Sequence, residues 1–338
     1  MFLPILLFIL GFLFLIKGGD WFVDGASKIA KRFKIPEIII GATIVSIGTT
    51  LPEVMVSATS AVTGHPEIAY GNAIGSIICN TSLISAVTIA VMPSKVDRKS
   101  MIIPVIFFFV SAIIYGIIAY TTHYFSRVTG ILFVVTFVIY MVVTIYRGFK
   151  HKDEENEEND EEEEDSKFLS KHPKIKAFTL TIWYELILLV IGAALIALGA
   201  KLLVDNGTII AQELGVPESV IAITFVALGT SLPELVTAIA SLVKGHSSLS
   251  IGNIIGANLF NIVLVCGVSI TLKPFSVPES TLIANIPMSL LIELPLMFVV
   301  MLILTVPALI SGKLKRWQGI LLLLLYFSFV TLQFMLSL

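Results

Sequence analysis

The sequence has 338 residues, of which 56% are apolar and only 14% are charged, and its mean hydropathy is +0.96. Globular domains carry about a quarter charged residues, so this composition excludes a cytosolic enzyme, a secreted disulfide scaffold and a nucleic-acid-binding protein. The net charge of −2 hides a division, because eleven of the 24 acidic residues lie between Asp153 and Asp165. The rest of the chain is hydrophobic and net basic.

Ten apolar stretches are long enough to cross a membrane as helices, which takes about 20 residues each. The first stretch has neither the positive segment nor the cleavage site of a signal peptide, so we expect it to be retained as a helix. The predicted spans are 2–24, 38–63, 69–92, 100–120, 125–147, 179–205, 218–243, 249–272, 280–305 and 315–337. This pattern predicts an all-α polytopic membrane protein.

The distribution of Lys and Arg predicts the orientation of these spans. With the N-terminus outside, 18 basic residues fall at cytoplasmic positions, and only Arg127, Lys201 and Lys273 fall in outer loops. Basic loops stay cytoplasmic. We therefore expect a multi-pass protein of the cell membrane whose N-terminus is outside and whose central acidic loop is cytoplasmic.

The two halves of the chain resemble each other. Residues 24–86 align without a gap onto residues 205–267, at a constant offset of 181 and with 23 identities in 63 positions. We predict a first five-helix repeat at 1–147, an acidic cytoplasmic linker at 148–178 and a second five-helix repeat at 179–338. Because each repeat has an odd number of spans, the second is inverted, as in transporters that bind substrate near the bilayer midplane between repeats.

The first shared motif is GTTLPE, residues 48–53, with its twin GTSLPE at 229–234. A carboxylate inside an apolar span is costly unless it faces a cavity, a partner or a cation. Helical spacing places Glu53 on one face with Thr49 and Thr50, and Glu234 has Thr230 and Ser231 in the same places. Proline lacks an N–H, so we expect free backbone oxygens around Ser46 to Gly48 and around Ala227 to Gly229.

The second shared motif is GNAIGSIICN, residues 71–80, with its twin GNIIGANLFN at 252–261. Asn72, Ser76 and Asn80 form a polar stripe, which Asn253 and Asn261 repeat. Such a stripe by itself is equally typical of two helices joined by hydrogen bonds. Opposite two glutamate-bearing helices, we interpret it as the other wall of an ion site.

All of these candidate ligands are oxygen atoms, which hard cations such as Ca²⁺ prefer, and neither His nor Cys is among them. Two glutamates supply a charge of −2, which one Ca²⁺ would neutralise and for which Na⁺ or protons could substitute. Competition for one set of oxygens is sufficient for exchange. We expect no cofactor, only transported ions.

The paired G-T-[ST]-L-P-E and G-N-x-I-G-[SA]-x-x-x-N elements resemble the two α-repeats of the calcium/cation antiporter superfamily, and of minimal prokaryotic sodium/calcium exchangers in particular. The resemblance extends over all ten spans. It implies that Glu53 and Glu234 are the central Ca²⁺ ligands, assisted by Thr49 and Thr230. It also implies Na⁺ sites formed by Thr50, Ser231, Ser76 and the backbone oxygens of Ser46 and Ala227.

Three positions depart from the family pattern. Position 257 is Ala where a hydroxyl is usual, which puts one Na⁺ site in doubt, and position 50 is Thr where Ser is common. Position 261 is Asn, whereas potassium-dependent exchangers carry Asp, so Asn261 argues against K⁺ dependence. The glutamate motif of the proton-coupled branch, G-N-x-x-E, is absent from this sequence, which favours sodium coupling.

The other charged residues are interpreted as structural. We expect Asp24, Asp205, Glu185 and Glu293 at helix ends or membrane interfaces, and His65 and His246 at interfaces. The acidic run lacks the spacing of an EF-hand loop, so we interpret it as a solvated linker.

The function predicted from the sequence is Na⁺/Ca²⁺ antiport by alternating access, performed by a monomer in membrane lipid and without enzymatic activity. H⁺/Ca²⁺ antiport at the same glutamates is the nearest alternative. A cation channel is a more distant one, because channels usually build their filters by rotational symmetry.

Overall fold

The computed structural model describes residues 2–151, 181–213, 229, 231–279, 282–283 and 285–337. In the first half the elements are α1 (Phe2–Phe33), α2 (Glu37–Ile40), η1 (Gly41–Val45), α3 (Ser46–Val62), α4 (Pro66–Cys79), η2 (Asn80–Ile84), α5 (Ser85–Val91), α6 (Arg98–Thr122), β1 (Tyr124–Phe125) and α7 (Arg127–His151). In the second half they are α10 (Ile182–Glu213), α13 (Leu232–Val243), α14 (Ser247–Phe260), η4 (Asn261–Cys266), α15 (Gly267–Leu272), β2 (Phe275–Ser276), β3 (Leu282–Ile283), β4 (Ile286–Pro287), η5 (Ser289–Glu293), α16 (Leu294–Ser311) and α17 (Arg316–Ser337).

Nine helical stretches among the described residues are long and apolar enough to cross a membrane. They match nine of the ten predicted spans and confirm an all-α polytopic membrane protein. The seventh predicted span, 218–243, lies partly outside the described residues, and its described part consists mainly of α13. The linker predicted at 148–178 also lies outside them, apart from the end of α7.

The predicted start of the ninth span is wrong. The sequence suggested a helix from residue 280, but β3 and β4 form a short hairpin there, with Ile283 opposite Ile286, and the helix begins only with η5. Asn285 has a φ of 66°, a left-handed conformation that Asn adopts more readily than most residues. Hydropathy alone does not distinguish an apolar hairpin from the first turn of a helix.

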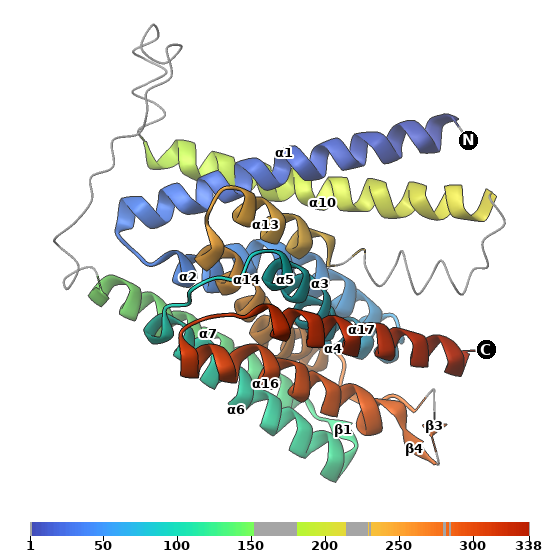
Figure 1. Cartoon of the computed structure of the whole chain (residues 1–338). Coiled ribbons are helices and arrows are strands. Elements are labelled where there is room, and N and C mark those ends of the chain that lie inside the picture. Colours follow the sequence, from blue (N-terminus) through green and yellow to red (C-terminus); the bar gives the residue numbers. More distant parts are fainter. Residues whose placement is uncertain are drawn as a thin grey trace, which may run out of the picture.

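Helices α1 and α10 lie side by side and run in opposite directions (Figure 1). A Cβ atom on Gly18 would lie 2.9 Å from the carbonyl oxygen of Gly192, and one on Gly199 would lie 2.7 Å from that of Gly11. The two contacts are related by the same offset of 181 residues that relates the motifs. Small residues allow such close approach in membranes, so the repeat extends further toward the N-terminus than the aligned region.

The last helix of each half packs against the other half. Gly130 of α7 packs against the backbone of Gly267 in α15, and Gly319 of α17 packs against the backbone of Ala86 in α5. Gly267 and Ala86 are again 181 residues apart. Each half therefore packs its final helix on the other half, and the two repeats form one interlocked core.

Backbone pairing joins the halves at both ends of the helices. β1 pairs with β2, with Phe125 opposite Phe275, and the backbones of residues 94–96 and 312–314 are hydrogen-bonded to each other. Both chain termini lie at one end of the helices, whereas the described ends of α7 and α10 that flank residues 152–180 lie at the other (Figure 1).

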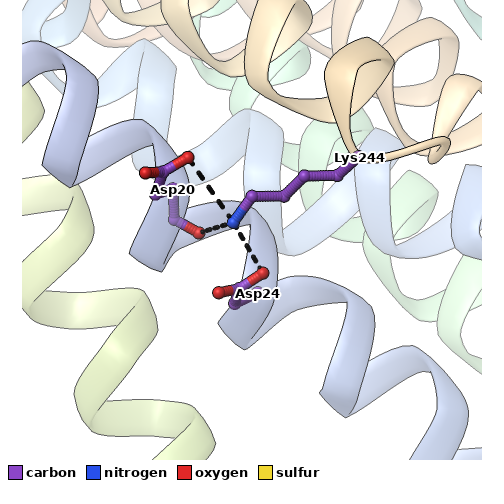
Figure 2. A network of polar contacts seen from close by, with 3 residues as sticks. All are labelled: Asp20, Asp24 and Lys244. Carbon is purple, nitrogen blue, oxygen red and sulfur yellow. Dashed lines mark hydrogen bonds and ion pairs between the residues drawn. The ribbon is translucent and has the colours of Figure 1, made fainter.

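A group of charged residues connects α1 to the loop after α13. The Lys244 ammonium group lies 2.7 Å from the Asp24 carboxylate, 2.8 Å from the Asp20 carbonyl oxygen and 3.6 Å from the Asp20 carboxylate (Figure 2). The sequence suggested that Asp24 lies at a helix end. Because α1 continues to Phe33, Asp24 instead lies inside the helix. Asp205 is likewise inside α10, where it pairs with Lys201.

Candidate functional site

The two motif glutamates lie in the interior of the molecule. Glu53 is near the middle of α3, Glu234 is in the first turn of α13, and both are fully buried. The two helices are in contact, and the two carboxylates are close enough to interact electrostatically. The fold thus brings together the two acids that the repeat predicted to belong to one site.

Neither carboxylate has a hydrogen-bond partner among the described residues. Partners are also missing there for four further predicted site residues, namely the Thr50 and Ser231 hydroxyls, the Asn80 amide and the Asn261 carbonyl oxygen. Buried polar groups are normally paired, and an unpaired buried charge is strongly unfavourable. These oxygen atoms match the ligand preference of a hard cation.

The hydroxyl groups of the first motif lie where the two repeats meet. Thr49 and Thr50 lie on α3 with Glu53, and α3 packs against α13, which carries Glu234. The sequence grouped each glutamate with the hydroxyls of its own motif, because it showed only the spacing along one helix. The packing of α3 against α13 instead combines groups from both repeats.

The same motif has a different local structure in each half. Pro52 lies inside α3, which continues through it without a break, whereas Pro233 lies in the first turn of α13. The expected interruption at Pro52 is therefore not found within α3. A π-helical segment, η1, precedes the motif instead, and the Tyr140 hydroxyl donates a 2.8 Å hydrogen bond to the Ala42 carbonyl there.

The two polar-stripe helices also widen into π-helices, at equivalent positions. η2 begins at Asn80 and η4 begins at Asn261, which are 181 residues apart. A π-helical turn changes the direction of the side chains that follow it and is frequent at functional sites. The sequence identified both asparagines, but it contained no signal for this change in helix geometry.

The remaining predicted residues have less direct support. Ser46 is buried and donates to the Gly41 carbonyl oxygen at 2.8 Å, and Ser76 is buried on α4 one turn before Asn80. Ala257 is also buried. Thr230 and Ala227 lie outside the described residues.

Asn253, which the sequence placed in the wall of the ion site, connects that wall to both motif helices. It accepts a hydrogen bond from Thr49 through Oδ1 and donates one to Thr237, a residue that the sequence did not assign to the site. Thr237 lies three residues after Glu234, so helical spacing would have identified it. In the first half, the Asn72 amide donates to the Glu53 carbonyl oxygen and to Ser57.

No group of three or more His, Cys, Asp or Glu side chains gathers anywhere in the described part of the chain. The acidic component of the candidate site is therefore two carboxylates, and its other oxygen atoms come from hydroxyls and amides. Zinc sites are built mainly around Cys and His ligands, and neither residue type is among these candidate ligands.

Comparisons with known proteins identify the family of this chain. Residues 3–146 and 184–335 match the family model described as sodium/calcium exchanger protein. The chain is 32% identical to the sodium/calcium exchanger MaX1 of Methanosarcina acetivorans, over 97% of this chain and 98% of that protein. It is 32% identical to the inner membrane protein YrbG of Escherichia coli, over 81% of each chain.

A solved structure of the sodium-calcium exchanger NCX_Mj, soaked with Na⁺ and Sr²⁺, superimposes with a TM-score of 0.78 and 31% identity over 98% of both chains. The match covers both halves and the candidate site between them. This protein belongs to the sodium/calcium exchanger family and is a membrane transporter, not an enzyme.

Proposed function

We propose that this protein exchanges Na⁺ for Ca²⁺ across the cell membrane by alternating access, with Ca²⁺ bound near the bilayer midplane between Glu53 and Glu234. The observation that supports this most directly is the pair of fully buried carboxylates without a protein cation or hydrogen-bond donor among the described residues. Neutralising their combined charge of −2 takes one Ca²⁺, two Na⁺ or two protons.

Each candidate ligand has a part in this proposal. Thr49 and Thr230 complete the Ca²⁺ site beside the two glutamates. The Na⁺ sites use the hydroxyls of Thr50, Ser231 and Ser76 and the backbone oxygens of Ser46 and Ala227, and the Asn80 and Asn261 amides line the cavity. Because Na⁺ and Ca²⁺ use the same carboxylates, loading with one ion excludes the other, as exchange requires.

The proposed orientation places the N-terminus outside and residues 148–178 in the cytoplasm, and the transporter acts as a monomer. The bias of Lys and Arg toward the predicted cytoplasmic loops supports this orientation. The positions of the termini and of the described ends of α7 and α10, at opposite ends of the helices (Figure 1), are compatible with it.

The test is Ca²⁺ uptake by purified protein in sealed lipid vesicles. Vesicles loaded with Na⁺ and diluted into Na⁺-free medium are expected to accumulate Ca²⁺, and vesicles with Na⁺ on both sides are not. Uptake that follows a pH gradient and ignores the Na⁺ gradient would contradict sodium coupling and assign the protein to H⁺/Ca²⁺ exchange. Ca²⁺ flux that needs no counter-ion gradient would instead indicate a channel.

A further inference from the structure

We propose that Asn253 is a positioning residue, which directs the proton of the Thr49 hydroxyl away from the ion site so that its lone pairs face a cation. This inference rests on the proposed role of Thr49 in Ca²⁺ binding. It concerns a residue that contacts no ion in the proposal and acts only through its hydrogen bonds.

The chain of hydrogen bonds starts at Thr237 on α13. Its hydroxyl lies 2.9 Å from the Pro233 carbonyl oxygen and 3.0 Å from that of Glu234. Carbonyl oxygens only accept hydrogen bonds, so the single hydroxyl proton of Thr237 is committed to its own helix. The Thr237 oxygen can then only accept from a third partner.

That third partner is the Asn253 side chain, 3.0 Å away. Since the Thr237 oxygen accepts, the atom facing it must be the donor Nδ2, which fixes the orientation of the amide. Oδ1 consequently faces α3, where it lies 3.2 Å from the Thr49 hydroxyl and 3.3 Å from the Ser46 hydroxyl. The Ser46 proton is taken by the Gly41 carbonyl oxygen at 2.8 Å, so the amide oxygen serves as the acceptor for Thr49.

The Asn253 Oδ1 atom determines whether the Thr49 hydroxyl can bind a cation. A hydroxyl group has one proton and two lone pairs, and a cation binds only the lone pairs. A Thr49 proton donated to Asn253 Oδ1 leaves both lone pairs of that hydroxyl free for a cation held by Glu53 and Glu234. Without Asn253, the nearby carboxylate would be the strongest acceptor for that proton, and the hydroxyl would bind the glutamate in place of the ion.

The packing of α14 keeps Asn253 at this distance. Gly252 and Gly256 flank it, and the backbone of Gly252 lies against the Ile38 carbonyl, while Gly256 lies against Ala42 and the Ser46 hydroxyl. A Cβ atom at either glycine would clash there and move α14 away from α3. Asn253 thus links Thr237 of the second repeat to Thr49 of the first.

The test is the isosteric substitution Thr237→Val, which removes the acceptor for Asn253 and leaves every proposed ligand in place. The half-saturating Ca²⁺ concentration of Na⁺-driven uptake is expected to rise about tenfold, the effect of about 1.4 kcal/mol, with the maximal rate within twofold of wild type. Thr237→Ser keeps the hydroxyl and is expected to restore wild-type half-saturation. Thr237→Ala is made alongside, in case valine impairs folding.

A matched control uses a second asparagine of α14, Asn258, and its hydrogen-bond partner Thr81. The Thr81 hydroxyl accepts a 2.7 Å hydrogen bond from the Asn258 amide of α14, and this pair has no contact with Thr49 or Ser46. Thr81→Val removes an equivalent buried hydrogen bond, so the melting temperature of this variant is expected to fall as in Thr237→Val. Its half-saturating Ca²⁺ concentration is expected to stay within twofold of wild type. Equal half-saturation shifts in the two variants would overturn the proposal, as would a wild-type value in Thr237→Val.

Equilibrium Ca²⁺ binding, measured by calorimetry on the purified protein, separates this inference from the proposed function. If wild-type protein binds Ca²⁺ but does not exchange it for Na⁺, sodium coupling is wrong, yet Thr237→Val must still weaken binding about tenfold. If Na⁺/Ca²⁺ exchange is present and Thr237→Val binds Ca²⁺ as tightly as wild type, the role of Asn253 is wrong and the proposed function stands.

Discussion

Two groups of acidic residues in this protein differ in what neutralises them. Where α1 contacts α10 and the loop after α13, the acids pair with basic side chains: Glu185 with Arg32, and Asp20 and Asp24 with Lys244. Glu53 and Glu234 are more deeply buried and have no such partner among the described residues. The first group holds helices together, whereas the second leaves negative charge available to a cation from outside.

The paired group also breaks the symmetry of the repeat. Lys244 corresponds to Thr63 in the first half, and Asp20 corresponds to Lys201. Among the described residues, Lys201 pairs with Asp205 alone, on its own helix, at 3.3 Å and largely exposed. The contact between α1 and α13 therefore has no charged equivalent at the corresponding positions of α10 and α3. The unpaired group, in contrast, has one glutamate from each repeat.

The largest effect is expected from removing the unpaired charges. Glu53→Gln and Glu234→Gln are each expected to lower Na⁺-driven Ca²⁺ uptake at least about 100-fold, because the remaining carboxylate cannot neutralise Ca²⁺. Neither variant should lose thermal stability, since an unpaired buried charge is itself unfavourable. Uptake and melting temperature are measured on the same preparation, and wild-type transport in either variant would disprove the site.

The opposite pattern is expected for Arg32→Met. It leaves Glu185, whose side chain is 5% exposed, buried without this partner, and we expect a loss of about 1–3 kcal/mol of stability. The matched double variant Arg32→Met/Glu185→Met is expected to recover most of the melting temperature. If Arg32→Met alone melts as wild type, the Arg32–Glu185 pair does not stabilise the α1–α10 contact.

A smaller effect is expected for Lys244→Met. The Asp20 and Asp24 side chains are about two-fifths exposed, and such pairs contribute about 0–1 kcal/mol. Loosening α1 from α13 by this amount would change the transport rate by at most about fivefold, and the reversed pair Lys244→Asp/Asp24→Lys should partly restore it. Lys201→Met, in the exposed pair on α10, serves as the control and should match wild type in both rate and melting temperature.

The smallest effect is expected for Ala257→Ser, which restores a hydroxyl where the first repeat has Ser76. If position 257 contributes to a Na⁺ site, the half-activating Na⁺ concentration should fall about twofold without a change in half-saturating Ca²⁺. The Na⁺ dependence of Ca²⁺ uptake measures this. An unchanged Na⁺ dependence would remove position 257 from the Na⁺ sites.

Sequence alone identified the membrane class, nine of the spans though not all of their ends, the repeat and the two glutamates. Hydropathy is a property of continuous segments, and a duplicated motif is visible without any knowledge of packing. The ninth span shows the limit of this approach, because the apolar hairpin at 282–287 has the same hydropathy as a helix.

Which groups meet follows from the packing of the helices and not from the sequence. Asn253 joins Thr49 of the first repeat to Thr237 of the second, and Arg32 pairs with Glu185. The π-helical turns at Asn80 and Asn261 were equally invisible in the sequence. The physical reason is that spacing along one helix fixes only which side chains share a face. Which face meets which depends on how closely the backbones approach, and glycine contacts between helices set that distance.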